Sequence, residues 1–139
     1  MPVGRPVSIP KLTGDLRRCG ADIRTVPLAA ALTVAAIPGL LGSEVADAEG
    51  SVHAGLPWLG CSVLVASSAA LRTMRAKAAS RTDTFVADVP TAAQNTRLYS
   101  EFIAAVAKAQ TEDMDYCAVS IVGPRNRVDK IVGKLPLMP

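Results

Sequence analysis

Two long stretches of the chain contain no charged side chain, and they set the first expectation about its fold. Residues 25–43 and residues 50–71 lack Asp, Glu, Lys and Arg altogether. Each stretch is at least as long as the roughly 18 apolar residues that indicate a membrane-spanning helix, and the first would form about 28 Å of helix. The pattern therefore predicts a mainly α membrane protein, built on a two-helix transmembrane hairpin over residues 25–74.

The two stretches differ in quality. The second contains many bulky apolar residues, and Pro57 can occupy its first helical turn, where a missing N–H does no harm. The first is rich in alanine, and Pro38 followed by Gly39 should kink or end its helix near Ala36 or Ile37. Two alternatives stay open. The second stretch alone could cross the membrane, or both could be buried helices of a soluble protein.

Charges around the hairpin are sorted by sign. The connector over residues 43–56 contains Glu44, Asp47 and Glu49 and no Lys or Arg, whereas basic residues flank the hairpin on both sides. This positive-inside pattern predicts that both termini lie on the matrix or cytoplasmic side, with Trp58 as an anchor at the membrane interface. The flanking residues are candidates for contact with anionic lipid such as cardiolipin. They are Arg17, Arg18, Arg24, Arg72, Arg75 and Lys77.

The parts outside the hairpin are expected to be an extended basic N-terminal arm, residues 1–24, and a soluble α+β appendage, residues 75–139, docked on partner subunits. In the appendage, Thr91 and Gln94 form a capping box that predicts a helix to about Gln110. One face of that helix should be buried, made by Leu98, Phe102, Ala105, Val106 and Ala109. Residues 116–122 and 128–132 are expected to form a short β-hairpin.

Composition narrows the class further. The chain has 139 residues, half of them hydrophobic, with 4% aromatic and 19% charged, which indicates one domain and argues against disorder and against a multidomain enzyme. Cys19, Cys61 and Cys117 cannot pair completely and show no C-x-x-C spacing. A disulfide scaffold, a zinc site and an iron–sulfur site are therefore not expected.

No catalytic motif is present, so no catalytic, cofactor-binding or metal-ligating residue is assigned. His53 is the only histidine. It could be an axial haem ligand or a proton donor at a quinone site, but no second histidine or local cysteine completes a ligand set, and we interpret it as a polar interfacial residue. The acidic residues Glu112, Asp113 and Asp115 lack the glycine and the later glutamate of a calcium loop, and are interpreted as a solvated helix end.

These observations predict a non-enzymatic accessory or structural subunit of a large inner-membrane complex. The preferred setting is the mitochondrial respiratory chain, in electron transport or ATP synthase, with other subunits and anionic lipid as partners. No nucleic acid, small-molecule substrate or cofactor is expected. One alternative is an accessory subunit of a photosynthetic or bacterial membrane complex. Another is a soluble basic structural protein of an organellar ribosome-like RNA particle, suggested by Arg125, Arg127, Lys130 and Lys134 and a pI near 9.0. An enzyme built on the appendage is the third.

Overall fold

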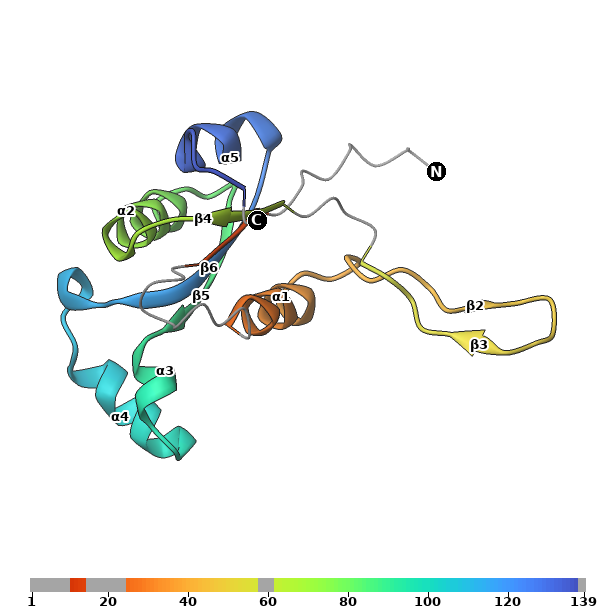
Figure 1. The fold of residues 1–139 in the computed structure, drawn as a ribbon, viewed down its shortest axis with the longest axis horizontal. Helices are drawn as coiled ribbons and strands as arrows, with labels where there is room; N and C mark the ends of the chain where they lie inside the picture. Colours follow the sequence, from red (N-terminus) through yellow and green to blue (C-terminus); the bar gives the residue numbers. More distant parts are fainter. Residues whose placement is uncertain (1–10, 15–24, 58–61, 138–139) are drawn as a thin grey trace.

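The structure, a computed structural model, describes residues 11–14, 25–57 and 62–137 of the chain. At its centre lies a sheet of order β4-β1-β6-β5, with helices on both faces (Figure 1). Its strands are β1 (Lys11–Gly14), β4 (Ser62–Val65), β5 (Phe85–Pro90) and β6 (Tyr116–Val122). β1 runs parallel to β4 and antiparallel to β6, and β5 runs antiparallel to β6.

Three helices cover the sheet. α1 (Thr25–Ala36) packs on one face, and α2 (Ser68–Ala79) and α5 (Arg125–Val132) pack on the other. Two segments extend away from this body in Figure 1. One is the short ladder of β2 (Val45–Ala46) and β3 (Val52–His53), between α1 and β4. The other joins β5 to β6 through α3 (Ala92–Asn95), α4 (Tyr99–Lys108) and a 3₁₀ turn, Thr111–Asp113.

β6 is the central element of the core. All seven of its residues are buried, because strands flank it on both sides and helices cover both its faces. Side chains of a strand alternate between faces, so Val119 and Ile121 pack toward α2 while Ala118 and Ser120 face α1. Valine and isoleucine suit this half-buried pleated surface, which explains why the sequence pattern indicates a strand here.

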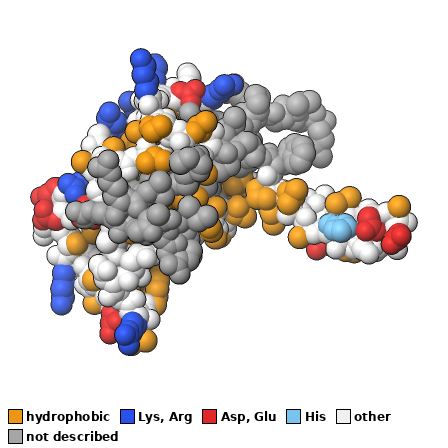
Figure 2. Space-filling view, in the orientation of Figure 1, with side chains coloured by type: hydrophobic (Ala, Val, Ile, Leu, Met, Phe, Trp, Pro, Cys, Tyr) orange, Lys and Arg blue, Asp and Glu red, His pale blue; other side chains and the backbone are white. Residues whose placement is uncertain are grey.

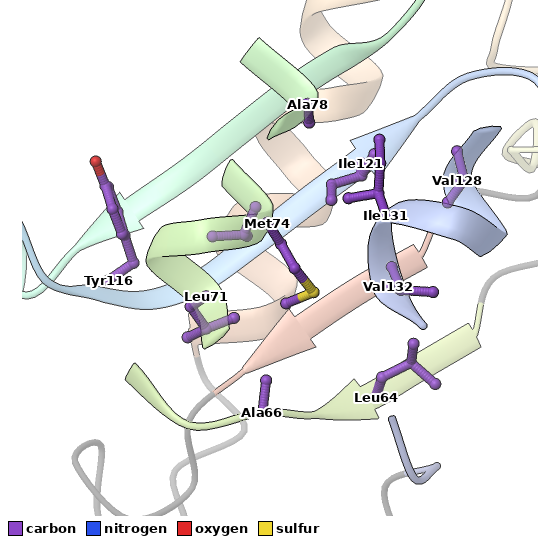
Figure 3. Close-up of a cluster of buried hydrophobic side chains, with 11 residues drawn as sticks. Leu64, Ala66, Leu71, Met74, Ala78, Tyr116, Ile121, Val128, Ile131 and Val132 are labelled. Carbon is purple, nitrogen blue, oxygen red and sulfur yellow. The ribbon is translucent and has the colours of Figure 1, made fainter. Parts of the chain in front are cut away.

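The larger part of the core lies between the sheet and the pair α2 and α5. Helix spacing of three and four residues directs one side of each helix inward. From α2 these residues are Leu71, Met74 and Ala78, and from α5 they are Val128, Ile131 and Val132. Figure 3 shows them converging with Leu64 of β4 and Ile121 of β6.

A β-bulge near the start of β6 changes which side chains share a face. Val89 pairs with Ala118 and Pro90 pairs with Tyr116, so Cys117 is the extra residue on β6. As a result Cys117 joins Ala118 on the α1 side of the sheet, whereas Tyr116 belongs to the cluster on the α2 side. The bulge therefore places neighbouring residues against different helices.

The structure overturns the membrane fold. Among the described helices none is long and apolar enough to cross a membrane. Residues 50–71 do not form one helix but include β3, β4 and the first turn of α2. The stretch lacks charges where β4 and the start of α2 pack into the core, so the absence of charge there reflects burial in protein. The transmembrane hairpin, its matrix-side topology and the location in the mitochondrial inner membrane are wrong.

One local expectation for the first stretch is confirmed. α1 ends at Ala36, and Gly39 follows with a φ of +79°, a conformation that suits glycine. Pro38 has no N–H to continue the helix. A helix of this length reaches only about 18 Å, well short of a bilayer core of about 30 Å.

The predicted elements of the C-terminal third are correct in part. The strand at residues 116–122 is confirmed as β6. The expected long helix is divided into α3 and α4, and the Thr91 side chain makes no capping hydrogen bond. Its expected buried face is also wrong, since no residue of α4 is buried.

The second strand of the expected β-hairpin is wrong as well, because residues 128–132 lie in α5. Val128, Ile131 and Val132 are spaced i, i+3 and i+4, which is the period of a helix face. Their β-branched side chains favour strands, but burial against α2 and the sheet decides the outcome.

Candidate functional site

Paired charges occupy the α2 face of the sheet at its bulged end. Arg75 Nε lies 2.9 Å from Asp88 Oδ2, and both side chains are mostly buried. The Arg75 guanidinium also sits 5.5 Å from the centre of the Tyr116 ring, within cation–π distance. The hydrogen bond to Asp88 raises the pKa of Arg75, and burial raises the pKa of the Tyr116 phenol. Arg75 thus binds Asp88 and Tyr116 of the same chain, and its charge is used within the fold.

A second arginine of α2 binds the two residues that precede β6. Arg72 donates to Asp115 Oδ1 over 2.7 Å and to the Met114 carbonyl over 3.0 Å. Charge-assisted bonds of this kind fix position as well as contributing energy. Together Arg72 and Arg75 fasten α2 to the strands at the bulge, which is a structural use of their charge.

Small polar groups on the α1 face are joined to one another. Thr33 Oγ1 lies 2.8 Å from the Ala29 carbonyl and 2.7 Å from Ser120 Oγ, and both side chains are buried. Since a hydroxyl has one proton, both contacts are satisfied when Thr33 donates to Ala29 and accepts from Ser120. The buried Cys117 thiol lies 3.8 Å from Thr91 Oγ1. A thiol enclosed in this way is inert packing rather than a nucleophile.

We call residues 41–57 the projecting hairpin. Backbone hydrogen bonds within this segment hold its two legs together. Leu41 bridges to Pro57 at its base, and the Gly42 N–H donates to the Leu56 carbonyl over 2.8 Å. A Cβ on Gly55 would collide with the Gly42 carbonyl, so the two legs approach in a way that only glycine permits. The segment is therefore a formed ladder with a fixed base.

The tip of the projecting hairpin is organised by Asp47. Its Oδ1 accepts N–H bonds from Glu49 and Ser51 at 3.0 Å each, and its Oδ2 lies 3.1 Å from His53 Nε2. The bond to His53 lowers the pKa of the Asp47 carboxyl, and the backbone bonds from Ser51 and Glu49 act in the same direction. Gly50 closes the turn with a φ of +88°. The tip thus presents an ionised carboxylate in a defined geometry.

Large apolar side chains of the projecting hairpin face solvent. Val45 is 62% exposed and Val52 65%, and Leu41 and Leu56 at the base are similarly open. Leu28 and Leu32 of α1 are also about half exposed, and Figure 2 shows hydrophobic side chains along the projecting hairpin. Exposed apolar side chains gathered on one segment of a small protein are typical of a binding site.

α4 presents a second exposed apolar side. Leu98, Tyr99 and Ile103 are all exposed, and the rings of Tyr99 and Phe102 lie 5.6 Å apart. The Glu101 carboxylate accepts from the Leu98 N–H over 3.3 Å and helps to begin the helix. The helix is amphipathic, as the sequence predicts, but its apolar side is largely uncovered.

The structure places only some of the residues singled out by the sequence. Arg72, Arg75 and Lys77 share α2, where the first two are ion-paired and Lys77 is exposed. Arg17, Arg18, Arg24 and Trp58 lie outside the described residues. Lipid contact by this set and the anchoring role of Trp58 stay predictions. His53 is on the projecting hairpin, 60% exposed, with Asp47 as its neighbour.

Sequence reasoning missed the partners that give these residues their roles. Asp88 lies 13 positions from Arg75, and Asp115 lies 43 positions from Arg72. Only the fold brings them together, although Asp88 inside an apolar strand is a signal that a cation is near. Across residues 11–14, 25–57 and 62–137 no three His, Cys, Asp or Glu side chains are gathered in a way that could hold a metal ion.

Comparison with known proteins places the fold. A solved structure of a protein of unknown function, Atu0240 from Agrobacterium tumefaciens strain C58, superposes with a TM-score of 0.78 at 14% sequence identity. The match covers 97% of this chain and 99% of that one. No curated protein shows significant sequence similarity. Residues 25–139 match a family described as "protein of unknown function (DUF2000)". The chain therefore belongs to the DUF2000 family.

Proposed function

We propose that the protein is a non-catalytic binding module, an accessory or structural subunit of a protein assembly, and that the projecting hairpin is its main contact with a partner. The observation that carries this proposal is the combination of a formed ladder with exposed apolar legs. Val45 and Val52 face solvent on a segment whose base and tip are both fixed by hydrogen bonds. Exposing such side chains is unfavourable unless a partner covers them.

The backbone of the projecting hairpin also suits a protein partner. β2 and β3 pair with each other as a two-stranded sheet, and neither joins the central sheet. An edge strand offers N–H and C=O groups to another chain, while exposed side chains beside it supply specificity. Because the ladder is already formed, binding would cost little conformational entropy. The exposed side of α4 supplies a second surface of the same kind.

The polar groups of the body support the non-catalytic part of the proposal. Arg72 and Arg75 are joined to carboxylates, and the Thr33 and Ser120 hydroxyls are joined to each other. A catalytic side chain must point toward a substrate bound in a cleft. These side chains are instead used to hold strands and helices together.

Site-specific photocrosslinking tests the proposal in intact cells. A photoreactive amino acid replaces Val52 in one variant and Glu112, which is exposed on the 3₁₀ turn, in a matched control. We expect discrete protein adducts from position 52 that are absent from position 112, and we expect Val45→Ser to weaken them. Equal labelling at both positions, or no adduct at position 52, would overturn the proposal.

A further inference from the structure

A shallow groove lies between α2 and α5, on the outer side of the main core. Its volume is about 330 Å³, and its lining is mainly apolar, with Thr73 and Lys77 as the polar residues. The apolar residues that line it include Ala70, Met74, Ile131, Val132 and Leu135. Lys77 also lines the groove. Lys134 lies in the chain between Val132 and Leu135 and is exposed. The groove thus combines a mainly apolar floor with the Lys77 ammonium group.

The projecting hairpin has the complementary character. It contains Glu44, Asp47 and Glu49 and no Lys or Arg, and its apolar legs are exposed. All 15 Lys and Arg residues of the chain therefore lie outside the projecting hairpin. Only nine of the 12 acidic residues lie there with them. Opposite charges on two surfaces favour their encounter and fix their orientation. The groove between α2 and α5 of a second copy offers the apolar surface and the lysine that such a hairpin requires.

The groove and the hairpin of one molecule are not placed to meet. Figure 1 shows the projecting hairpin directed away from the body, while α2 and α5 lie over the body itself. The Gly42 to Leu56 hydrogen bond joins the two legs of the hairpin at its base. Contact between the two surfaces therefore requires two molecules.

From these observations we propose that the projecting hairpin of one molecule docks in the α2–α5 groove of a second copy. Val52 covers its apolar floor, and Glu44 and Glu49 lie against Lys77 and Lys134 of that copy. This inference rests on the proposed binding function of the hairpin and names its partner. Because hairpin and groove are different surfaces, each molecule can use both at once, and the assembly can grow beyond a dimer.

Sedimentation of the purified full chain tests self-association directly. We expect the average mass to rise above the 14.4 kDa of one chain as concentration approaches about 200 μM, and the rise to be weaker at about 500 mM salt than at about 50 mM. A chain that stays monomeric at every concentration and at both salt levels overturns the inference, whatever the variants do.

Charge reversal then locates the contact. Glu44→Lys with Glu49→Lys gives the hairpin the charge of the groove, and Lys77→Glu with Lys134→Glu gives the groove the charge of the hairpin. Each double variant alone should associate at least about tenfold more weakly than the original chain. Mixed in equal amounts, the two variants should recover association, because the hairpin of each variant now carries the charge opposite to that of the other variant's groove. Glu112→Lys with Asp113→Lys reverses two exposed charges elsewhere and should change association less than about twofold.

The outcomes separate this inference from the proposed function. Failure of the mixture to recover association, or equal weakening by the control, overturns the hairpin–groove contact. If the purified chain is monomeric while position 52 still gives specific adducts with other proteins in cells, the binding function stands and the second copy is the wrong partner. If neither self-association nor specific adducts are found, both proposals fail.

Discussion

Thr33 of α1 and Ser120 of β6 share a buried hydrogen bond of 2.7 Å that joins the helix to the middle of the sheet. Thr33 also bonds to the Ala29 carbonyl, so it is the buried Ser120 hydroxyl that depends on this contact. The pair fixes where α1 lies along β6, which apolar contacts between small side chains such as Ala29 and Ala118 specify less sharply.

Thr33→Val should destabilise the protein by about 1–3 kcal/mol, because it leaves the Ser120 hydroxyl buried without its partner. Urea unfolding measures the loss. Thr33→Ser keeps the hydroxyl and should cost less. The double variant Thr33→Val with Ser120→Ala should cost less than the sum of the two single changes, and strict additivity would show that the two hydroxyls do not interact.

Arg75→Met should also destabilise the protein, by about 1–3 kcal/mol, because the mostly buried Asp88 carboxylate then loses its cation. Arg75→Lys keeps the charge but not the planar group above Tyr116. Its thermal unfolding temperature should therefore lie between those of Arg75→Met and the original chain. Replacing both partners, Arg75→Met with Asp88→Leu, should recover much of the loss. No recovery in the double variant would argue that Arg75 acts through Tyr116 alone.

Gly55→Ala should open the base of the projecting hairpin while leaving the body folded. An added methyl group collides with the Gly42 carbonyl, whereas the sheet and its helices are untouched. Hydrogen exchange should show faster loss of the Gly42 amide proton, with core amides such as that of Val119 unchanged. Gly42→Ala meets the Leu56 carbonyl at 3.0 Å, a milder contact, and should have a smaller effect.

The order of the hairpin tip should depend on acid pH. Hydrogen bonds from His53 and the backbone lower the pKa of Asp47 below its ordinary value of 3.8. A carboxyl with a lowered folded-state pKa stabilises the fold fully above its ordinary pKa, and the contribution is lost as pH falls through the folded-state value. NMR signals of Ser51 and Glu49 amides should therefore shift as pH falls below about 3.8. Asp47→Asn should abolish this titration, and its persistence would assign the effect to another group.

The sequence predicted local features better than it predicted their assembly. The end of α1 at Ala36 and the strand character of residues 116–122 follow from local chemistry, namely Pro38 with Gly39 and a run of β-formers. Residues 50–71 were misinterpreted because an uncharged run is equally compatible with lipid and with a protein core. Only the pairing of Ser62–Val65 with β1 distinguishes the two, and that pairing is between distant segments.

The candidate site was predicted less well, for a related reason. Glu44, Asp47 and Glu49 were recognised as an acidic connector between helices, but nothing local indicated that the connector forms a ladder of its own. The ladder depends on Gly42 and Gly55 meeting across 13 positions, and on Asp47 accepting bonds from residues that follow it. Likewise the sequence predicts lipid contact for Arg72 and Arg75 and not their ion pairs, because the carboxylate partners lie 43 and 13 positions away.

The position of β6 in the sheet has a consequence for the order in which the protein can fold during synthesis. β6 pairs with β1 on one side and β5 on the other, and it is the last of the four strands to be made. Until it leaves the ribosome, β5 has no neighbour in the sheet, and the apolar sides of α1 and α2 lack the strand that separates them. A nascent chain that ends before residue 116 should therefore be protease-sensitive and dependent on chaperones, and native structure should appear in one late step.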